Sequence, residues 1–209
     1  MAGAWLVIEV GVLELQGNYA LHHNIFSDLG IRSKGVKLPK HLDGVDGLVI
    51  PGGESTTMSL LLDTFKLREP IKDFAKENSI MGTCAGLIMM AKKIEHETKV
   101  VPLNILDIMV NRNAYGRQIM SKKMSINLKL NNELMPLNST LIRAPKIIDY
   151  GKDVMVLTML ENSPAAVMQN MHLGLSFHPE LDGISIFHEL LFNPSSKYYW
   201  NNLNKVDAA

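Results

Sequence analysis

The single cysteine of the chain stands in a segment that is typical of a nucleophile. Cys84 lies at the centre of Gly82-Thr83-Cys84-Ala85-Gly86, after the short apolar run Ile80-Met81 and before a segment with helical spacing. Glycines two positions to either side allow the sharp strand-to-helix turn of a nucleophile elbow, here with cysteine in place of serine. The helix that follows favours the thiolate, and the amide N–H of Ala85 is placed to stabilise an oxyanion. A small buried cysteine is the ordinary alternative, but this context favours a nucleophile.

A histidine and a glutamate supply the base that such a nucleophile needs. His178 and Glu180 stand in Ser176-Phe177-His178-Pro179-Glu180, directly after the apolar run Leu173 to Leu175. Histidine can act as base towards a thiol and then protonate a leaving amine near neutral pH. Residues i and i+2 of an extended chain project to the same side, and Pro179 biases His178 towards extended backbone. We therefore expect Glu180 to orient the imidazole, although such a pair alone is more often a surface feature.

A glycine pair marks a third segment, Pro51-Gly52-Gly53-Glu54-Ser55-Thr56, between an expected strand and an expected helix. Unobstructed N–H groups at Gly52 and Gly53 allow a substrate oxygen to approach the backbone. A plain tight turn, with Ser55 or Thr56 capping the helix, fits equally well. The segment lacks the pattern of a nucleotide-binding P-loop.

Other candidates are weaker. Arg112 and Arg117 have the chemistry to bind a carboxylate, but their spacing fits ordinary surface arginines better. The adjacent His22 and His23 point about 100° apart on a helix and cannot chelate one ion together. No other histidine has metal-site spacing, so we expect neither a metal nor a cofactor. We interpret the remaining histidines as structural or exposed: His41, His96, His172 and His188. The 13 methionines are interpreted as core residues, with a partner surface as the secondary alternative.

Apolar patterns predict an α/β fold that would position these residues. The first half alternates strand-like and helix-like segments, which implies a mainly parallel sheet covered on both faces. Helices are expected over Tyr19–Leu29, from Ser55 or Thr56, and over Leu67–Asn78, Leu87–Lys93 and Ile184–Phe192. Strands are expected over Val10–Leu15, Leu48–Ile50, Ile80–Met81, Ile108–Val110, Met124–Leu130, Val154–Leu160, Ala165–Gln169 and Leu173–Phe177.

Composition limits the remaining possibilities. The chain has 209 residues without a linker, a repeat or a low-complexity segment, so we expect one domain over residues 1–209. Lysine plus arginine and aspartate plus glutamate both number 21, which gives no electrostatic case for nucleic acid or an anionic membrane. The apolar start of the chain has no basic region and is expected to be a strand rather than a signal peptide. One cysteine excludes an internal disulfide and suggests a cytoplasmic protein.

Taken together, the motifs resemble those of class I, triad-type glutamine amidotransferases. The resemblance is closest to the family of glutaminase subunits of pyridoxal 5′-phosphate synthase. The matching segments span nearly the whole chain and are Leu15-Gln16-Gly17, Pro51 to Thr57, Gly82 to Leu87, Arg112 to Gln118, Ile142-Arg143-Ala144-Pro145 and Ser176 to Leu181.

This resemblance implies a flavodoxin-like fold with helices on both faces and a Cys84–His178–Glu180 triad that hydrolyses L-glutamine. It implies a glutamine site formed by Gly53, Glu54, Ser55, Arg112, Ile142 and Arg143, and an oxyanion site formed by Gly53, Ala85 and Gln16. It also implies that the ammonia passes to a (β/α)₈ synthase subunit, in a complex of twelve synthase and up to twelve glutaminase subunits.

Three segments depart from the family pattern, although none includes a triad residue. Leu21 stands where a glutamate is usual, Met120-Ser121-Lys122 replaces Asp-Ser-Phe, and the stretch before Val10 is longer than usual. Three alternatives remain open: a glutaminase for another synthase, such as the imidazole glycerol phosphate enzyme; a cysteine hydrolase of the same sheet topology; and an inactive regulatory subunit. The motifs argue against the first, and the intact triad residues argue against the third.

Overall fold

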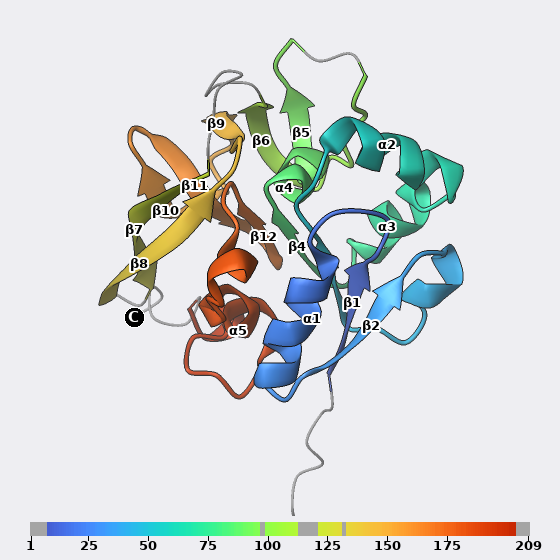
Figure 1. The fold of residues 1–209 in the computed structure, drawn as a ribbon, viewed down its shortest axis with the longest axis horizontal. Coiled ribbons are helices and arrows are strands. Elements are labelled where there is room, and N and C mark those ends of the chain that lie inside the picture. Colours follow the sequence, from blue (N-terminus) through green and yellow to red (C-terminus); the bar gives the residue numbers. More distant parts are fainter. Residues whose placement is uncertain (1–7, 97–98, 113–120, 131–132, 204–209) are drawn as a thin grey trace, which may run out of the picture.

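The computed structural model describes residues 8–96, 99–112, 121–130 and 133–203. Within them, a seven-stranded sheet has the order β10-β11-β12-β4-β3-β1-β2 (Figure 1). Five of these strands run parallel: β1 (Glu9–Leu13), β2 (Arg32–Val36), β3 (Gly47–Ile50), β4 (Ser79–Thr83) and β12 (His172–Leu175). The strands β10 (Met155–Leu160) and β11 (Ser163–Gln169) extend the sheet in antiparallel fashion. The predicted mainly parallel, flavodoxin-like sheet is confirmed.

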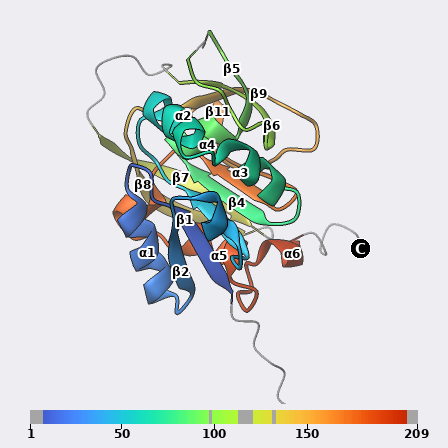
Figure 2. The ribbon, with the colours of Figure 1, turned by 90° about the vertical axis from the view of Figure 1, so that its right-hand side faces the viewer.

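Helices cover both faces of this sheet (Figure 2). One face carries α1 (Tyr19–Asp28) and α5 (Ile186–Phe192), and the other carries α2 (Ser55–Thr64), α3 (Arg68–Phe74) and α4 (Ala85–Met90). Side chains of a strand alternate between the two faces. Accordingly, Leu48 and Ile50 of β3 pack in the core under α2 to α4, whereas Val49 packs under α1 and α5.

Two smaller sheets flank the central one. The first has the order β5-β6-β9 and contains β5 (Ala91–Ile94), β6 (Leu106–Asn111) and β9 (Lys146–Tyr150). The second is the pair β7 (Lys122–Leu130) and β8 (Glu133–Leu141), which lies beside β10 (Figure 1). The hydroxyl of Thr158 in β10 donates to the carbonyl oxygen of Asn127 in β7 at 2.6 Å. Shorter elements are the 3₁₀ helices η1 (Pro39–Leu42) and η2 (Pro179–Asp182) and the helix α6 (Trp200–Leu203).

The predicted helix over Leu87–Lys93 is wrong in its second half. The helix α4 ends at Met90, and the chain continues as β5, which pairs with β6. The carbonyl groups of Met89, Met90 and Ala91 accept hydrogen bonds from the backbone N–H groups of residues 103–105 instead of from a following helical turn. Long-range pairing therefore overrides the local helical pattern. The predicted helix over Leu67–Asn78 is also shorter, since α3 ends at Phe74.

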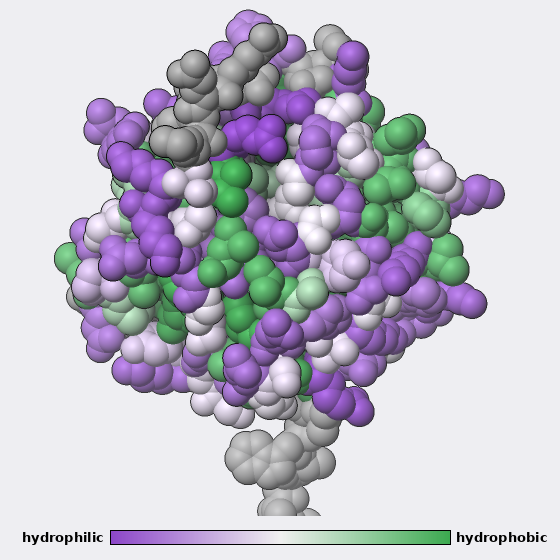
Figure 3. All heavy atoms as spheres, viewed as in Figure 1, coloured by the Kyte–Doolittle hydropathy of each residue, from purple (hydrophilic) through white to green (hydrophobic). Residues whose placement is uncertain are grey.

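The surface seen in Figure 3 is mostly hydrophilic, with hydrophobic atoms gathered over α2 among other places. Leu60 of α2 is 66% exposed, and Phe65 just beyond the helix is also exposed. Among the helices of the described residues, none combines the length and apolar character that a membrane span requires.

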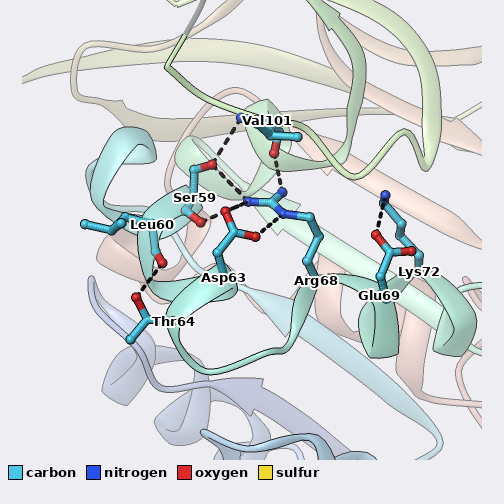
Figure 4. A network of polar contacts seen from close by, with 8 residues as sticks. All are labelled: Ser59, Leu60, Asp63, Thr64, Arg68, Glu69, Lys72 and Val101. Atoms are coloured by element: carbon cyan, nitrogen blue, oxygen red, sulfur yellow. Dashed lines mark hydrogen bonds and ion pairs between the residues drawn. The ribbon is translucent and has the colours of Figure 1, made fainter.

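A buried arginine ties α2, α3 and the segment before β6 together (Figure 4). The guanidinium of Arg68 forms ion-paired hydrogen bonds with Asp63 at 2.5 and 2.9 Å. It also donates to the carbonyl and the hydroxyl of Ser59 at 2.9 and 3.0 Å and to the carbonyl of Val101. The Ser59 hydroxyl accepts the Val101 N–H in turn at 3.1 Å. One planar side chain thus bonds to buried acceptors on Ser59 and to partly buried ones on Asp63 and Val101, which arginine alone has enough donors to do.

We expect Arg68→Met to lower the free energy of unfolding by about 2–3 kcal/mol, because it removes the charged hydrogen bonds that join Asp63, Ser59 and Val101. The matched control is Lys72→Met on α3, which removes the exposed pair with Glu69 but no hydrogen bond of the Arg68 network and should change stability by less than about 0.5 kcal/mol. Urea denaturation of both variants measures the difference. Equal effects would contradict a stabilising role for the Arg68 network.

Candidate active site

The segments singled out by their chemistry meet at one edge of the central sheet. Gln16 follows β1, the turn from Pro51 follows β3, Cys84 follows β4 and His178 follows β12. These four strands are parallel, so their carboxyl ends lie together. This edge is where α/β sheets place their ligand sites.

Cys84 sits in the sharp turn that the sequence predicts. Its backbone has φ 48° and ψ −101°, a strained conformation for a residue with a side chain, and α4 begins at the next residue. Its N–H donates to the carbonyl of Leu175 in β12 at 2.8 Å, and its side chain is buried. A side chain at Gly86 would collide with the backbone carbonyl of Ile50. The glycine therefore allows the first turn of α4 to pack against β3 and fixes the position of the thiol.

His178 and Glu180 form a short buried pair. The imidazole Nδ1 and the carboxylate Oε1 are 2.6 Å apart, and both side chains are almost completely buried. The expected contact between the two side chains is present, but the expected extended backbone is not. Glu180 lies in the 3₁₀ helix η2 rather than in extended chain, and His178 caps that helix. The tight turn at Pro179 brings the two side chains together where an extended strand was expected.

The environment of His178 favours its protonated form. Burial lowers the pKa of this imidazole, but the interactions with Cys84 and with the Glu180 carboxylate outweigh burial and raise the pKa to about 10. The ring is therefore positively charged at neutral pH. A side chain at Gly52 would collide with the His178 ring and would approach the Cβ of Cys84. The turn after β3 thus lies directly over the Cys84–His178 pair.

That turn is held by the loop after β1. The amide of Gln16 makes two hydrogen bonds to the backbone of Glu54, one accepted from its N–H and one donated to its carbonyl, each at 3.1 Å. The Asn18 N–H donates to the carbonyl of Gly52 at 3.3 Å. A side chain at Gly17, whose φ is 88°, would collide with that carbonyl. Contacts from one neighbouring loop therefore set the orientation of the Gly52–Gly53 peptide.

Glu54, and not Ser55 or Thr56, caps α2, which corrects the prediction from sequence. Its carboxylate accepts hydrogen bonds from the N–H groups of Thr56 and Thr57 at 2.9 and 2.6 Å. Burial raises the pKa of this carboxyl, but the hydrogen bonds from Thr56 and Thr57 outweigh it and lower the pKa to about 2. Ser55 is instead buried in the first turn of the helix. The turn therefore keeps a permanent negative charge beside the Cys84 site.

Of the remaining predicted residues, the structure describes Arg112, Ile142 and Arg143 but not Arg117. Arg112 reaches the turn, with Nη2 at 3.4 Å from the Glu54 carboxylate and 3.1 Å from the Thr56 hydroxyl. The Ile142 carbonyl oxygen lies 3.7 Å from the Cys84 sulfur, and Arg143 follows as an exposed residue with φ 43°. Arg117 and Met120 lie outside the described residues.

The strand β8 and the helix η2 add a support that the sequence did not indicate. The Asp182 carboxylate accepts from the backbone N–H of Thr140 at 2.6 Å and from its hydroxyl at 3.1 Å. The Thr140 carbonyl in turn accepts the His178 N–H at 3.0 Å. Lys123 pairs with the same Asp182 carboxylate at 2.9 Å. The backbone of His178 is thus anchored by Thr140 and Asp182, which lie far from each other in the sequence.

Two buried histidines behind Glu180 were also not connected by their spacing. His22 of α1 and His188 of α5 contact each other, and His22 lies near the Glu180 carboxylate.

Across the residues that the structure describes, no group of three or more histidine, cysteine, aspartate and glutamate side chains is arranged to hold a metal ion.

Comparison with known proteins agrees with this geometry. The sequence model of the SNO glutamine amidotransferase family matches residues 12–193. A protein of Thermosipho africanus named pyridoxal 5′-phosphate synthase subunit PdxT is 41% identical over 191 residues, which are 91% of this chain and 100% of that protein. The protein of the same name from Oenococcus oeni is 43% identical over 184 residues, covering 88% of this chain and 95% of the relative.

Solved structures give the same result. A crystal structure of a glutamine amidotransferase aligns with a TM-score of 0.81 at 35% identity and covers 87% of this chain and 96% of its own. The structure of PurLQS from Thermotoga maritima has a TM-score of 0.67 at 16% identity, covering 89% of this chain and 98% of its own, which supports the fold alone. With the elbow cysteine, the His–Glu pair and these matches, the chain belongs to the SNO glutamine amidotransferase family.

Proposed function

We propose that this protein is the glutaminase subunit of a pyridoxal 5′-phosphate synthase. It hydrolyses L-glutamine to L-glutamate and ammonia and delivers the ammonia to the synthase subunit. The observation that carries the proposal is the juxtaposition of the elbow cysteine Cys84 with the buried His178–Glu180 pair in a chain of this family. The relatives that resemble the chain along most of its length bear the name of that synthase subunit.

Hydrolysis begins at the sulfur of Cys84. The thiolate attacks the side-chain amide carbon of glutamine, and the resulting oxyanion accepts hydrogen bonds from the N–H groups of Gly53 and Ala85. His178, already protonated, gives its proton to the leaving amine, so ammonia departs and a thioester remains. His178 then takes a proton from water, which attacks the thioester and releases glutamate. Glu180 stabilises the imidazolium during the cycle.

Binding of the α-amino and α-carboxylate groups of glutamine falls to the turn and its neighbours. The fixed negative charge of Glu54 suits an ammonium group, whereas Arg112 and Arg143 suit a carboxylate. Backbone groups of Gly53 and Ile142 and the start of α2 at Ser55 complete the proposed glutamine site. The contact between Arg112 and Glu54 lets the two opposite charges neutralise each other until the substrate enters.

The loop after β1 is the proposed link to the synthase. Its hydrogen bonds from Gln16 and Asn18 set the direction of the Gly52–Gly53 peptide, and that peptide carries one of the two oxyanion donors. A peptide beside glycine rotates at little steric cost, so a docked partner can select its active orientation. We assign the partner as a (β/α)₈ synthase subunit in an assembly of twelve synthase and up to twelve glutaminase subunits, on the basis of the family resemblance.

Two further expectations accompany this proposal. The chain forms one domain, because β10, β11 and β12 of its second half join the sheet of its first half. Its compartment is the cytoplasm, since a nucleophilic cysteine must remain reduced.

The nucleophile is tested by Cys84→Ala. Because no other side chain at the elbow can form the thioester, we expect kcat for glutamine hydrolysis to fall by roughly 10⁴–10⁶-fold, as it does when a triad nucleophile is removed. An electrophilic glutamine analogue should label the unmodified protein once and the variant not at all. Circular dichroism controls for folding, and substantial hydrolysis by the folded variant would refute the mechanism.

The His178–Glu180 pair is tested by His178→Asn and Glu180→Gln. Loss of the acid–base group should lower kcat by at least ~10²–10⁴-fold, and loss of the orienting carboxylate should lower it less. Removing the negative charge of Glu180 also lowers the pKa of His178, so the alkaline limb of the kcat/KM profile should move to lower pH. Profiles of kcat/KM measured between about pH 6 and 11, which bracket the ordinary histidine pKa of about 6.5 and the raised pKa of about 10, test this shift. An unshifted limb would assign it to another group.

The link to the partner is tested by ammonia release with and without the synthase subunit. The chain alone should be slow, and docking should raise kcat by ~10²–10³-fold, the typical value of one oxyanion donor. Gln16→Ala should abolish this activation. Calorimetry of the docking step distinguishes lost activation from lost binding, and full activity without a partner would mean that the oxyanion site is preformed.

A further inference from the structure

The Glu180 carboxylate has a second buried neighbour that the triad does not use. Its Oε1 bonds to His178, whereas its Oε2 faces Nε2 of His22 at 3.9 Å. The Nδ1 of His22 lies 2.9 Å from Nε2 of His188. All three side chains are almost completely or completely buried. The active-site pair therefore continues inwards through two imidazoles carried by α1 and α5.

Three polar atoms in this arrangement lack a conventional hydrogen bond within the described part of the chain: Oε2 of Glu180, Nε2 of His22 and Nδ1 of His188. A buried carboxylate oxygen without a donor is costly, and the atom facing it is a ring nitrogen that can carry a proton. Oε2 of Glu180 and Nε2 of His22 are therefore complementary if His22 is protonated at Nε2. Nδ1 of His188, if unprotonated, is an acceptor without a donor.

The His22–His188 contact selects between the two possible proton arrangements. Both rings are neutral, since burial lowers the pKa of each to about 3, with the neighbouring His188 adding to the effect on His22. If His22 donated from Nδ1, its bare Nε2 lone pair would face the Glu180 carboxylate. If His188 donates from Nε2, the single proton of His22 must sit on Nε2 and point at Oε2. Electrostatics favours the second arrangement, because it replaces a repulsion by an attraction.

The surroundings hold these rings in place. Phe26 of α1 packs against His188 edge-on, with 5.1 Å between the ring centroids, and the His22 and His188 rings are tilted by 43°. Glu180 from η2 acts on the charge of His22, as do His178 ahead of that helix, His188 from α5, and His23 from α1. Glu180 favours a positive His22, but burial and the other histidines prevail. The His22 ring is thus a neutral, preoriented donor.

We propose that His22 is a positioning residue for the triad: its Nε2–H attracts the second oxygen of Glu180 electrostatically across 3.9 Å, and His188 fixes the His22 tautomer that makes this possible. The carboxylate is then restrained from both sides, by His178 at Oε1 and by His22 at Oε2. This restraint keeps the short His178–Glu180 bond aligned. The kinetic consequence rests on the proposed glutaminase function, whereas the tautomer does not.

The tautomer is measured directly by ¹⁵N NMR of the imidazole nitrogens in the unmodified protein near neutral pH, with assignments from His22→Gln and His188→Gln. We expect both His22 and His188 to carry their proton on Nε2. Protonation of His22 at Nδ1 would overturn the proposal, whatever the enzymatic activity of the protein. This arm therefore remains decisive even if the protein fails to hydrolyse glutamine.

The kinetic arm compares His22→Phe, which keeps a ring but no donor, with His22→Gln, whose amide restores an N–H near the Nε2 position. We expect His22→Phe to lower kcat by roughly 10–100-fold with little change in KM, the loss seen for outer partners that orient a histidine in metal sites. His22→Gln should recover most of that loss. The matched control is His23→Gln on the same helix, whose side-chain hydrogen bonds go to Ser33 and Glu14 rather than to the triad, and it should leave kcat unchanged.

The kinetic results and the NMR results test the proposal separately. Equal kcat in His22→Phe and the unmodified enzyme, or equal losses in His22→Phe and a folded His22→Gln, would overturn the positioning role. If His22→Phe does not fold, the NMR tautomer and the activity of His22→Gln decide it: His22→Gln should then retain most of the activity. If the unmodified protein and its complex release no ammonia at all, the proposed function fails while the tautomer result still stands.

Discussion

Several segments at the carboxyl edge of the central sheet approach one another more closely than any side chain would permit, and the geometry of the candidate site depends on that approach. Gly86 lies against the backbone of Ile50, Gly52 lies against the His178 ring, and Gly17 lies against the Gly52 carbonyl. Gly86 belongs to the first turn of α4, Gly52 to the turn after β3 and Gly17 to the loop after β1, so the three contacts fix the relative positions of Cys84, His178 and that turn. A methyl group at any of these glycines would push two of the segments apart and displace Cys84 or His178 from its present position.

Close packing removes water from charged groups, and the site compensates with short, specific partners. The buried Glu180 carboxylate has His178 at 2.6 Å, and the histidine in turn keeps its proton because Glu180 and Cys84 surround it. The more exposed Glu54 is stabilised by two N–H groups at the start of α2. His178 and Glu54 are therefore each held in one protonation state near neutral pH. A fixed imidazolium is what departure of an amine requires, so the same electrostatics that make burial tolerable also prepare the chemistry.

Sequence patterns predicted those parts of this arrangement that are encoded within a few residues. The glycines around Cys84 and the apolar runs before Pro51 and Cys84 led to the parallel sheet and the elbow. The end of α4 at Met90 was not predictable in this way, because it depends on backbone bonds from residues 103–105. The Thr140–Asp182 anchor and the His22–His188 pair join residues 42 and 166 positions apart. Spacing along the chain contains no information about such contacts, whereas the fold supplies them.

The helix α1 connects two of these features. Immediately before it, Gln16 and Asn18 hold the turn that carries a proposed oxyanion donor. Within it, one turn further along, His22 faces the Glu180 carboxylate. A helix of 10 residues with a buried face moves largely as a rigid unit, so a displacement at its first residue is transmitted to His22. A partner that docks against the loop before α1 would thereby act on the oxyanion turn and on the alignment of the triad at once. The turn after β3 and the Glu180 carboxylate are thus both contacted by α1 or by the loop directly before it.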